Sequence, residues 1–219
     1  DHGSGNKGSL YKARGTEVPC IIRWPEGVRS VRCRELIQNT DFVPTWFDLA
    51  GAVPPKDYKI DGISLKPLFL KPNKPVRDHV FCEMGAARSI KTKEFSYVAV
   101  RYTKEQVEGV RAGNRRHIKT MTGLSGGVSR SVTTHPAAYT SDQLFNLDQD
   151  SESKNNLADD PRHAKKLEDL KKQLTAELKR FPQRPFGEFV PGGNALPGGG
   201  YGDVFKTLLK ASKEKKVKK

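Results

Sequence analysis

Cysteine is scarce in this sequence, with three residues in 219. The number of cysteines is odd, and the three positions, Cys20, Cys33 and Cys82, are widely spaced. The sequence therefore contains neither a disulfide framework nor a zinc-binding pattern. Cys20 lies in the apolar run PCIIRWP, which is bounded by prolines and predicts a short buried strand over residues 19–25. We therefore expect Cys20 to be a small buried side chain.

Long hydrophobic runs are also missing. No stretch is long enough to cross a bilayer, no signal peptide is recognisable, and no repeat period is present. Hydrophobic residues make up 35% of the chain, below the usual share, so we expect part of the chain to remain unpacked. The length allows one full domain or one and a half small ones, and we expect no membrane partner.

Basic residues outnumber acidic ones by 39 to 25, which gives a net charge of +14. A charge of this size favours a polyanionic partner, and a non-catalytic polyanion-binding protein is one possible function. Residues 206–219 carry seven lysines and one glutamate, so a basic tail accounts for much of the excess. No zinc pattern or basic strand interleaved with aromatics is present, and no nucleic-acid partner is predicted.

The first third of the chain predicts an α/β layer. Residues 1–18 are polar and glycine-rich and are expected to form a loop before the strand. Residues 34–50 predict a helical region in two pieces, with Thr40 and Asp41 as capping candidates and Gly51 in a left-handed cap. A strand, a loop and a helix in succession are typical of an α/β layer, which we expect to end near residue 75.

The second part of the chain predicts a smaller α+β unit. The segments VFCEM, ARSIK, EFSYVAV and QLFN predict strands that form an antiparallel sheet. Asp160 and Pro161 begin a helix whose leucines recur every three or four residues, as expected for a helix packed on that sheet. Residues 103–140 predict a surface insertion, and residues 191–219 a disordered basic tail.

Asp1, His2 and Lys7 are the residues that suggest chemistry. Aspartate oxygens suit calcium or magnesium, whereas histidine is more common with softer metals. The turn Gly3-Ser4-Gly5 lets the chain fold back, so the Lys7 ammonium can approach an anion that the metal holds. A metal and a fixed cation that meet at one small anion are what sulfuryl or phosphoryl transfer needs.

Five segments, in the same order, resemble motifs of the sulfatase family, part of the alkaline-phosphatase-like superfamily. They run over residues 1–181 and read DHG…KGSLY…EVPCIIRWPEGV, NTDFVPTWFDLAG, IDGISLKPLF, ARSIKTKEFSYV and QLFNLDQDSESKNNLADDP. The resemblance implies that Asp1 and His2 are calcium ligands and that Lys7 contacts the sulfate. Departures occur at YKARG, where the family often has a glutamate and paired glycines, and at Glu17, where an arginine is frequent.

The family's nucleophile is a formylglycine, made from Cys or Ser in a Cys/Ser-x-Pro/Ala-x-Arg motif. Cys20 is followed by IIR and Cys33 by REL, so neither fits. The resemblance places the nucleophile and the other metal ligands upstream of Asp1. It implies an α/β fold, with residues 1–75 as the C-terminal part of the catalytic core, residues 76–190 as an α+β subdomain and the basic tail after it.

We therefore expect the C-terminal fragment of a sulfatase that hydrolyses a sulfate ester or sulfamate, inactive without its N-terminal half. The resemblance implies a sulfated small molecule or polysaccharide as substrate, and a secreted, periplasmic or lysosomal location. Two alternatives remain open at this point. One is a phosphodiesterase or phosphonate hydrolase of the same superfamily, and the other is the non-catalytic polyanion-binding protein.

Overall fold

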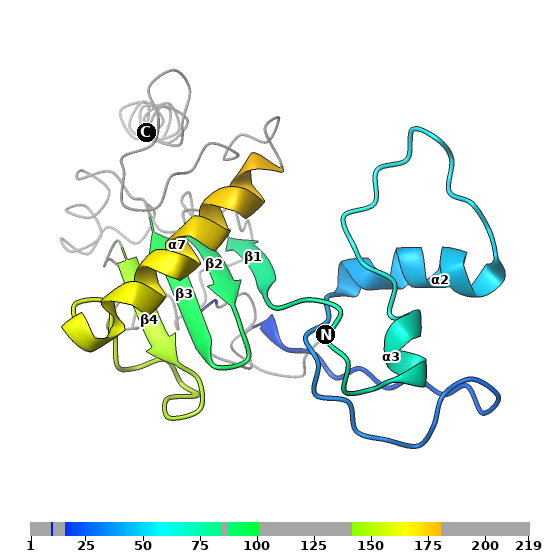
Figure 1. Cartoon of the computed structure of the whole chain (residues 1–219), viewed down its shortest axis with the longest axis horizontal. Coiled ribbons are helices and arrows are strands. Elements are labelled where there is room, and N and C mark those ends of the chain that lie inside the picture. The colour runs from blue at the N-terminus through cyan, green and yellow to red at the C-terminus, as the bar shows by residue number, and fades with distance from the viewer. Residues whose placement is uncertain (1–9, 11–15, 85–86, 101–141, 181–219) are drawn as a thin grey trace, which may run out of the picture. The chain divides into compact units, whose positions relative to one another are not determined.

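The computed structural model describes Leu10 and residues 16–84, 87–100 and 142–180 (Figure 1). Two compact units divide the chain, one of residues 19–80 and one of residues 1–18 with 81–219. The expected insertion over 103–140 and the expected tail over 191–219 lie outside the described residues, and the domain boundaries at 75 and 190 stay predictions. No helix in the described ranges is both long enough and apolar enough to cross a membrane.

The sequence-predicted antiparallel sheet is confirmed. Its four strands lie in the order β1-β2-β3-β4, and β3 pairs antiparallel with both β2 and β4. The strand bounds are Val80–Met84 for β1, Ala87–Lys91 for β2, Phe95–Val100 for β3 and Asp142–Asn146 for β4. Branched and aromatic side chains favour these strands because they pack well on a pleated surface.

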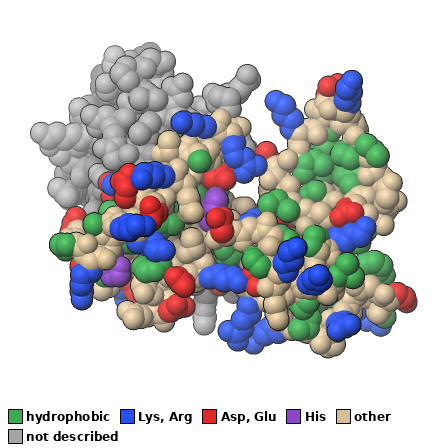
Figure 2. Space-filling view, viewed as in Figure 1, with side chains coloured by type: hydrophobic (Ala, Val, Ile, Leu, Met, Phe, Trp, Pro, Cys, Tyr) green, Lys and Arg blue, Asp and Glu red, His purple; other side chains and the backbone are tan. Residues whose placement is uncertain are grey.

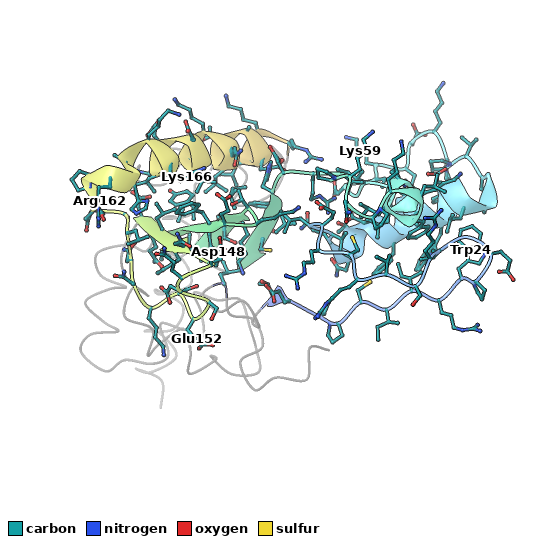
Figure 3. All side chains as sticks on the ribbon, turned by 60° about the horizontal axis from the view of Figure 1, so that its bottom comes forward. Trp24, Lys59, Asp148, Glu152, Arg162 and Lys166 are labelled. Carbon is teal, nitrogen blue, oxygen red and sulfur yellow. The ribbon has the colours of Figure 1, made fainter. Side chains whose placement is uncertain are left out.

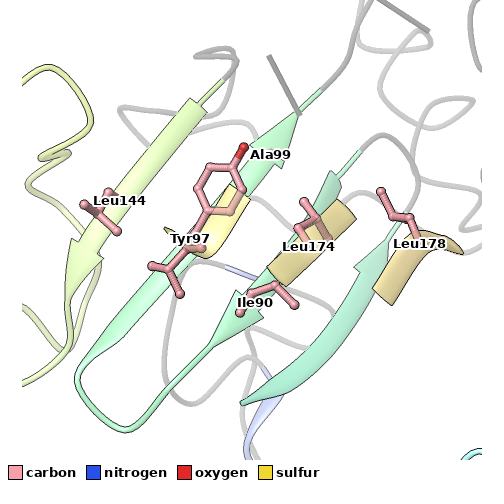
Figure 4. Packing of buried hydrophobic residues seen from close by; sticks show 7 residues of the cluster. Ile90, Tyr97, Ala99, Leu144, Leu174 and Leu178 are labelled. Atoms are coloured by element: carbon pink, nitrogen blue, oxygen red, sulfur yellow. The ribbon is translucent and has the colours of Figure 1, made fainter. Parts of the chain in front are cut away.

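Helix α7, Ala164–Lys179, packs on one face of this sheet, as its leucine spacing predicts (Figure 4). Leu174 and Leu178 are buried in one cluster with Ile90 and Tyr97 of the sheet. A short 3-10 turn, η2 (Pro161–His163), precedes the helix. Its N-cap is Asp160, as predicted.

The Asp160 carboxylate accepts a hydrogen bond from the backbone N–H of Arg162 at 3.0 Å. The Arg162 side chain also donates to this carboxylate, and together these bonds lower the pKa of Asp160 to about 2. The carboxylate therefore stays ionised and keeps its capping role over the whole range in which proteins usually work. Arg162 projects from the start of the helical region, as Figure 3 shows.

The unit of residues 19–80 holds three short helical elements. They are η1 (Asn39–Asp41), α2 (Phe42–Ala50) and α3 (Lys66–Leu70). The expected helical region is confirmed over residues 39–50, as η1 followed by α2, whereas residues 34–38, where it was expected to begin, have neither helix nor strand. Gly51 ends α2 with φ of +63°, the left-handed conformation that glycine adopts without a steric penalty.

Asp41 is the centre of this unit, and its carboxylate caps the helical region at the start of η1, in a capping box with Gln38, and not at the start of α2. Its side chain is fully buried and forms a bidentate ion pair with Arg77, with both N···O distances at 2.5 Å. It also accepts backbone N–H bonds from Gln38 at 2.6 Å and from Ile63 at 2.9 Å. One carboxylate thus joins the start of the helical region to two later segments, which have no regular backbone pairing of their own.

Thr45 extends this network from inside α2. Its hydroxyl donates to the Asp41 carbonyl oxygen and accepts the backbone N–H of Leu65 at 2.9 Å. Gly62 is required nearby, because a Cβ at that position would lie 2.1 Å from the carbonyl oxygen of Thr40. Hydrogen bonds of Asp41 and Thr45, and the close contact of the Gly62 and Thr40 backbones, therefore hold the segments of this unit together more than apolar packing does.

The strand expected over residues 19–25 is not formed. Residues 19–24 have neither helix nor strand, and each of them is exposed. Cys20 is exposed too, which corrects the expectation that it is buried. An apolar run forms a strand only when another strand supplies the hydrogen-bond ladder, and the described part of this unit contains no such strand.

Candidate functional site

The three residues predicted to form the site, Asp1, His2 and Lys7, lie outside the described residues. Their roles as metal ligands and sulfate contact therefore stay predictions. The structure does describe the sheet to which the segment after them is attached. Leu10 stands three residues after Lys7, and Thr16 nine residues after it.

Leu10 is part of the core on the second face of the sheet. It is 2% exposed and belongs to a buried cluster with one residue from β2, two from β3 and one from β4, namely Ala87, Val98, Val100 and Phe145. Strand side chains alternate between faces, so this cluster lies opposite the one that α7 covers. The sheet is therefore buried on both faces, and the N-terminal segment contributes to the second.

Lys91 provides a second attachment for the same segment. It is the last residue of β2, it is 7% exposed, and its Nζ donates a hydrogen bond to Thr16 Oγ1 at 2.7 Å. Seventy-five positions separate the two residues in sequence. A buried ammonium needs such partners, because an unpaired one loses its hydration without compensation. Leu10 and Thr16 thus fix the chain to the sheet shortly after the predicted site residues.

The environment of Lys91 shifts the pKa of its amine. Burial lowers the pKa of the Lys91 amine, and the neighbouring charges of Cys82 and Glu17 oppose this shift without cancelling it. Burial in turn raises the pKa of the Cys82 thiol, against the opposing effects of Lys91 and of a hydrogen bond with Ser89. The ammonium form of Lys91 and the thiolate form of Cys82 are both disfavoured, because burial on the second face of the sheet removes their hydration.

A pH-dependent contribution to stability follows from this shift. A lysine with a lowered folded-state pKa binds fewer protons when folded than when unfolded, in the window between that pKa and the ordinary value of about 10.4. The free energy of unfolding should therefore rise with pH through this window. We expect Lys91→Met to remove this part of the rise, as measured by urea unfolding at a series of pH values from 7.5 to about 10.4 with detection by circular dichroism.

Lys93→Met is the matched control for this experiment. Lys93 is two residues away and exposed, so its removal should leave the pH dependence of the wild-type chain almost unchanged. Equal pH dependence in the wild-type chain and in Lys91→Met would contradict the assignment of a desolvated amine.

The described residues hold no metal centre of their own. Among them, no group of three or more His, Cys, Asp or Glu side chains is placed to bind a metal ion. Sequence reasoning missed Lys91 as the anchor of the N-terminal segment. The available signal was a lysine that ends an otherwise buried strand, but the sequence does not show that its partner is Thr16.

A family model and several relatives match the chain. Residues 1–106 match the family model described as N-sulphoglucosamine sulphohydrolase, C-terminal. The ulvan-active sulfatase of Formosa agariphila is 26% identical over 190 residues, which cover 82% of this chain and 36% of that protein. Arylsulfatase A of Bos taurus is 27% identical over 194 residues, which cover 81% of this chain and 34% of that protein. The chain spans about a third of the length of these relatives.

Two solved structures share the fold. One, from work on glycosaminoglycan metabolism by Bacteroides thetaiotaomicron, has a TM-score of 0.52 and 21% identity, and covers 76% of this chain and 30% of that one. The other was solved in complex with its substrate, D-glucosamine-2-N,6-O-disulfate. It has a TM-score of 0.50 and 21% identity, and covers 74% of this chain and 28% of that one. The alkaline-phosphatase-like fold class predicted from the sequence is thereby confirmed.

Proposed function

Because this chain belongs to the sulfatase family and matches the C-terminal portion of its members, we propose that it is the C-terminal part of an enzyme that hydrolyses a sulfate ester or sulfamate. The observation that carries the proposal is the match of residues 1–106 to the C-terminal family model, which includes Asp1, His2 and Lys7. In this proposal these three residues belong to an active site that the chain upstream of Asp1 completes.

The described contacts hold the chain to the sheet shortly after these residues, at Leu10 and Thr16. Catalytic groups need to be held in place by rigid elements, because small displacements reduce the rate strongly. Leu10 is buried in the sheet core, and Thr16 accepts a hydrogen bond from the buried Lys91. The sheet can therefore act as the rigid support of the segment that begins at Asp1.

The proposed roles follow from the charge of each side chain. The Lys7 ammonium binds the sulfate and stabilises negative charge that develops on its non-bridging oxygens. The Asp1 carboxylate provides hard oxygen ligands to a divalent cation, and the His2 imidazole lies beside it in sequence. Protonation of the leaving group requires a residue outside this chain, because no other position of the chain matches a catalytic motif of the family.

Calcium is the cation that the donor set of Asp1 and the family resemblance favour. When bound, it would supply positive charge against the sulfate oxygens. Calcium takes about six to eight oxygen ligands, so Asp1 and His2 cannot form the whole site, and the chain upstream must supply the rest. The nucleophile, a formylglycine by resemblance, also belongs to that upstream segment.

We propose a sulfated small molecule or polysaccharide as the substrate class. One structure of the same fold was solved with a sulfated glucosamine, and one relative is described as ulvan-active. We also propose a secreted, periplasmic or lysosomal location, in keeping with a relative from Drosophila melanogaster that is described as an extracellular sulfatase homologue.

Product release by the complete protein tests the proposed function. The chain with its upstream coding sequence should release sulfate from an aryl sulfate, and the chain of residues 1–219 should release none, because it lacks the nucleophile. A phosphate diester assayed in parallel should be cleaved far more slowly. Cleavage of the diester to its alcohol and a phosphate monoester, without sulfate release from the aryl sulfate, would instead support the phosphodiesterase alternative. Turnover by residues 1–219 alone would contradict the proposed mechanism.

A further inference from the structure

Cys20 and Cys33 lie on the two arms of one turn. The carbonyl oxygen of Trp24 closes this turn, because it accepts backbone N–H bonds from Gly27 at 3.0 Å and from Val28 at 2.8 Å. Cys20 stands four residues before Trp24, and Cys33 stands five residues after Val28. The blue segment of Figure 1 runs out to the turn and back. The two cysteines therefore stand at about the same distance from the turn, one on each arm.

Ring packing holds the turn in place. A Cβ at Gly27 would lie 2.2 Å from the ring of Trp24, so glycine is what lets this ring lie against the backbone of the turn. The Trp24 ring also meets the ring of Phe69 edge-on, with 6.3 Å between the two centroids. Phe69 belongs to α3, and Figure 3 labels Trp24. The turn is therefore attached to α3 through Trp24.

The thiols of Cys20 and Cys33 are accessible and near each other. Both are free and exposed in the structure. Partial burial raises the pKa of the Cys20 thiol, and the charge of the Cys33 thiolate raises it further. Exposed charges more than about 10 Å apart are largely screened at ordinary salt, so this effect requires the two sulfur atoms to be near each other. The spacing of the cysteines in the sequence does not indicate this pair.

The Cys33 thiol has a hydrogen bond that oxidation of its sulfur removes. Its Sγ donates to the carbonyl oxygen of Pro72 at 3.2 Å. A thiol is a weak donor, and this contact is exposed, so water can replace the thiol at the carbonyl oxygen. Cys33 can therefore exchange Pro72 for Cys20 as its partner at little cost.

We propose that Cys20 and Cys33 form a disulfide bond by reaction with an anionic small-molecule disulfide, for which oxidised glutathione is the probe. The Cys33 thiolate attacks one sulfur of the oxidant, which forms a mixed disulfide and releases one small thiol. The Cys20 thiolate then attacks Cys33 Sγ and releases the second small thiol. The two protein thiols lose two electrons and two protons, and the oxidant takes up both as its S–S bond breaks.

Charge and protonation favour this reagent and this order of steps. Arg32 and Arg34 flank Cys33 in sequence, and both are exposed. Figure 2 shows Lys and Arg side chains, in blue, on the surface of both units. Cations beside a thiol raise the local concentration of an anionic reagent. The raised pKa of Cys20 leaves less thiolate at that residue, so the first attack comes from Cys33.

The disulfide bond adds a constraint to a unit with little apolar core. Among residues 19–80, Leu65 and Leu68 are the buried hydrophobic side chains. The bond closes a loop of fourteen residues, from Cys20 to Cys33. Closing a loop of this length removes entropy from the unfolded chain, so the bond should form about 100-fold more favourably in the folded protein. A secreted or periplasmic location, as proposed above, is one in which disulfides persist, and the inference needs nothing else from the proposed function.

Equilibration with glutathione tests the proposal. The complete protein is incubated at about pH 8 with mixtures of oxidised and reduced glutathione, once in native buffer and once in urea. Acid and alkylation then stop the exchange, and mass spectrometry of the peptides gives the fraction in which Cys20 and Cys33 are linked. We expect the equilibrium constant for this bond to be about 100-fold larger in the folded protein than in urea. Cys82 packs against the core on the second face of the sheet and should stay reduced in the folded protein.

Variants of the complete protein separate the two steps. Cys20→Ser should accumulate the mixed disulfide with glutathione at Cys33, because no second protein thiol displaces it. Replacing both Arg32 and Arg34 by Gln in this variant should slow its reaction with oxidised glutathione several-fold. The rate with a neutral oxidant, 2-hydroxyethyl disulfide, should stay the same, because charge attraction plays no part in that reaction.

Replacing Lys56 and Lys59 by Gln in the same Cys20→Ser chain is the matched control. Both lysines are exposed cations of the same unit and lie outside the two arms of the turn, so both rates should stay unchanged. Equal slowing by the lysine and the arginine replacements would overturn the assignment of an anionic reagent to this site, because net charge alone would then explain the effect.

Two outcomes would overturn the proposed bond. An equilibrium constant in the folded protein that is no more than a few-fold larger than in urea would show that the fold does not bring the two sulfur atoms together. A main product that links Cys33 to Cys82, or to a second copy of the protein, would show a different pairing. The wild-type measurement needs no variant, so it decides the question even if a variant fails to fold. A complete protein that forms the bond between Cys20 and Cys33 but releases no sulfate would disprove the proposed function and leave this inference in place.

Discussion

Replacing Lys7 by Met in the complete protein is expected to lower kcat/KM for a sulfate ester by about 10²–10³, the usual effect of losing one charge-stabilising donor. Methionine keeps the length of the side chain and removes its charge. The substitution should mainly remove stabilisation of the transition state, because the negative charge on the sulfate oxygens is largest there. Calcium content and thermal stability should stay at wild-type values, because in our proposal Lys7 binds the substrate and not the metal.

Lys12→Met is the matched control for this prediction. Lys12 stands five residues after Lys7 in the same segment but outside the matched motif, so its replacement should leave kcat/KM nearly unchanged. A damaging Lys12→Met together with a harmless Lys7→Met would show that the loop is out of register with the family motif. The departure at YKARG would then be the cause.

Replacing Asp41 by Asn should destabilise the unit of residues 19–80 by about 3–5 kcal/mol, because it leaves the guanidinium of Arg77 buried without its partner. Asp41 is fully buried and the Arg77 side chain is 8% exposed, so solvent cannot compensate for the lost charge. Both tryptophans of the chain, Trp24 and Trp46, lie in this unit. Urea unfolding followed by tryptophan fluorescence therefore reports on it selectively.

Asp48→Asn provides the comparison for Asp41. Asp48 pairs with Lys66 at 3.0 Å, but both side chains are more than 40% exposed. Exposed ion pairs contribute little to stability because water screens both charges, so this substitution should change the unfolding midpoint little. Similar losses in the two variants would show that the Asp41 network does not hold the unit together.

The elements with a strong local signal were predicted correctly from the sequence. Helix α7 has regular leucine spacing and a clear start at Asp160 and Pro161, and both features are determined by neighbouring residues. The strand pair β2–β3 is joined by a short polar turn, so its pairing partner is also local in sequence. Local patterns of this kind require no knowledge of the rest of the fold.

The features that depend on distant partners were missed. Asp41 has the sequence context of a helix cap and its carboxylate does cap η1, but the same carboxylate also binds Arg77, thirty-six positions away, which the sequence did not indicate. Lys91 is anchored to Thr16 across seventy-five positions. Residues 19–24 have the composition of a buried strand and are exposed in this chain. A side chain's type indicates what kind of partner it needs, but only the fold shows which residue is that partner.

The most direct test of the central claim is a crystal structure of the complete protein with calcium and a sulfated ligand. We predict an Asp1 carboxylate oxygen at about 2.3–2.6 Å from the calcium ion. We also predict the Lys7 Nζ at about 2.7–2.9 Å from a sulfate oxygen. A structure in which the sulfate and its metal are bound by other residues, with Asp1 and Lys7 away from both, would contradict the account.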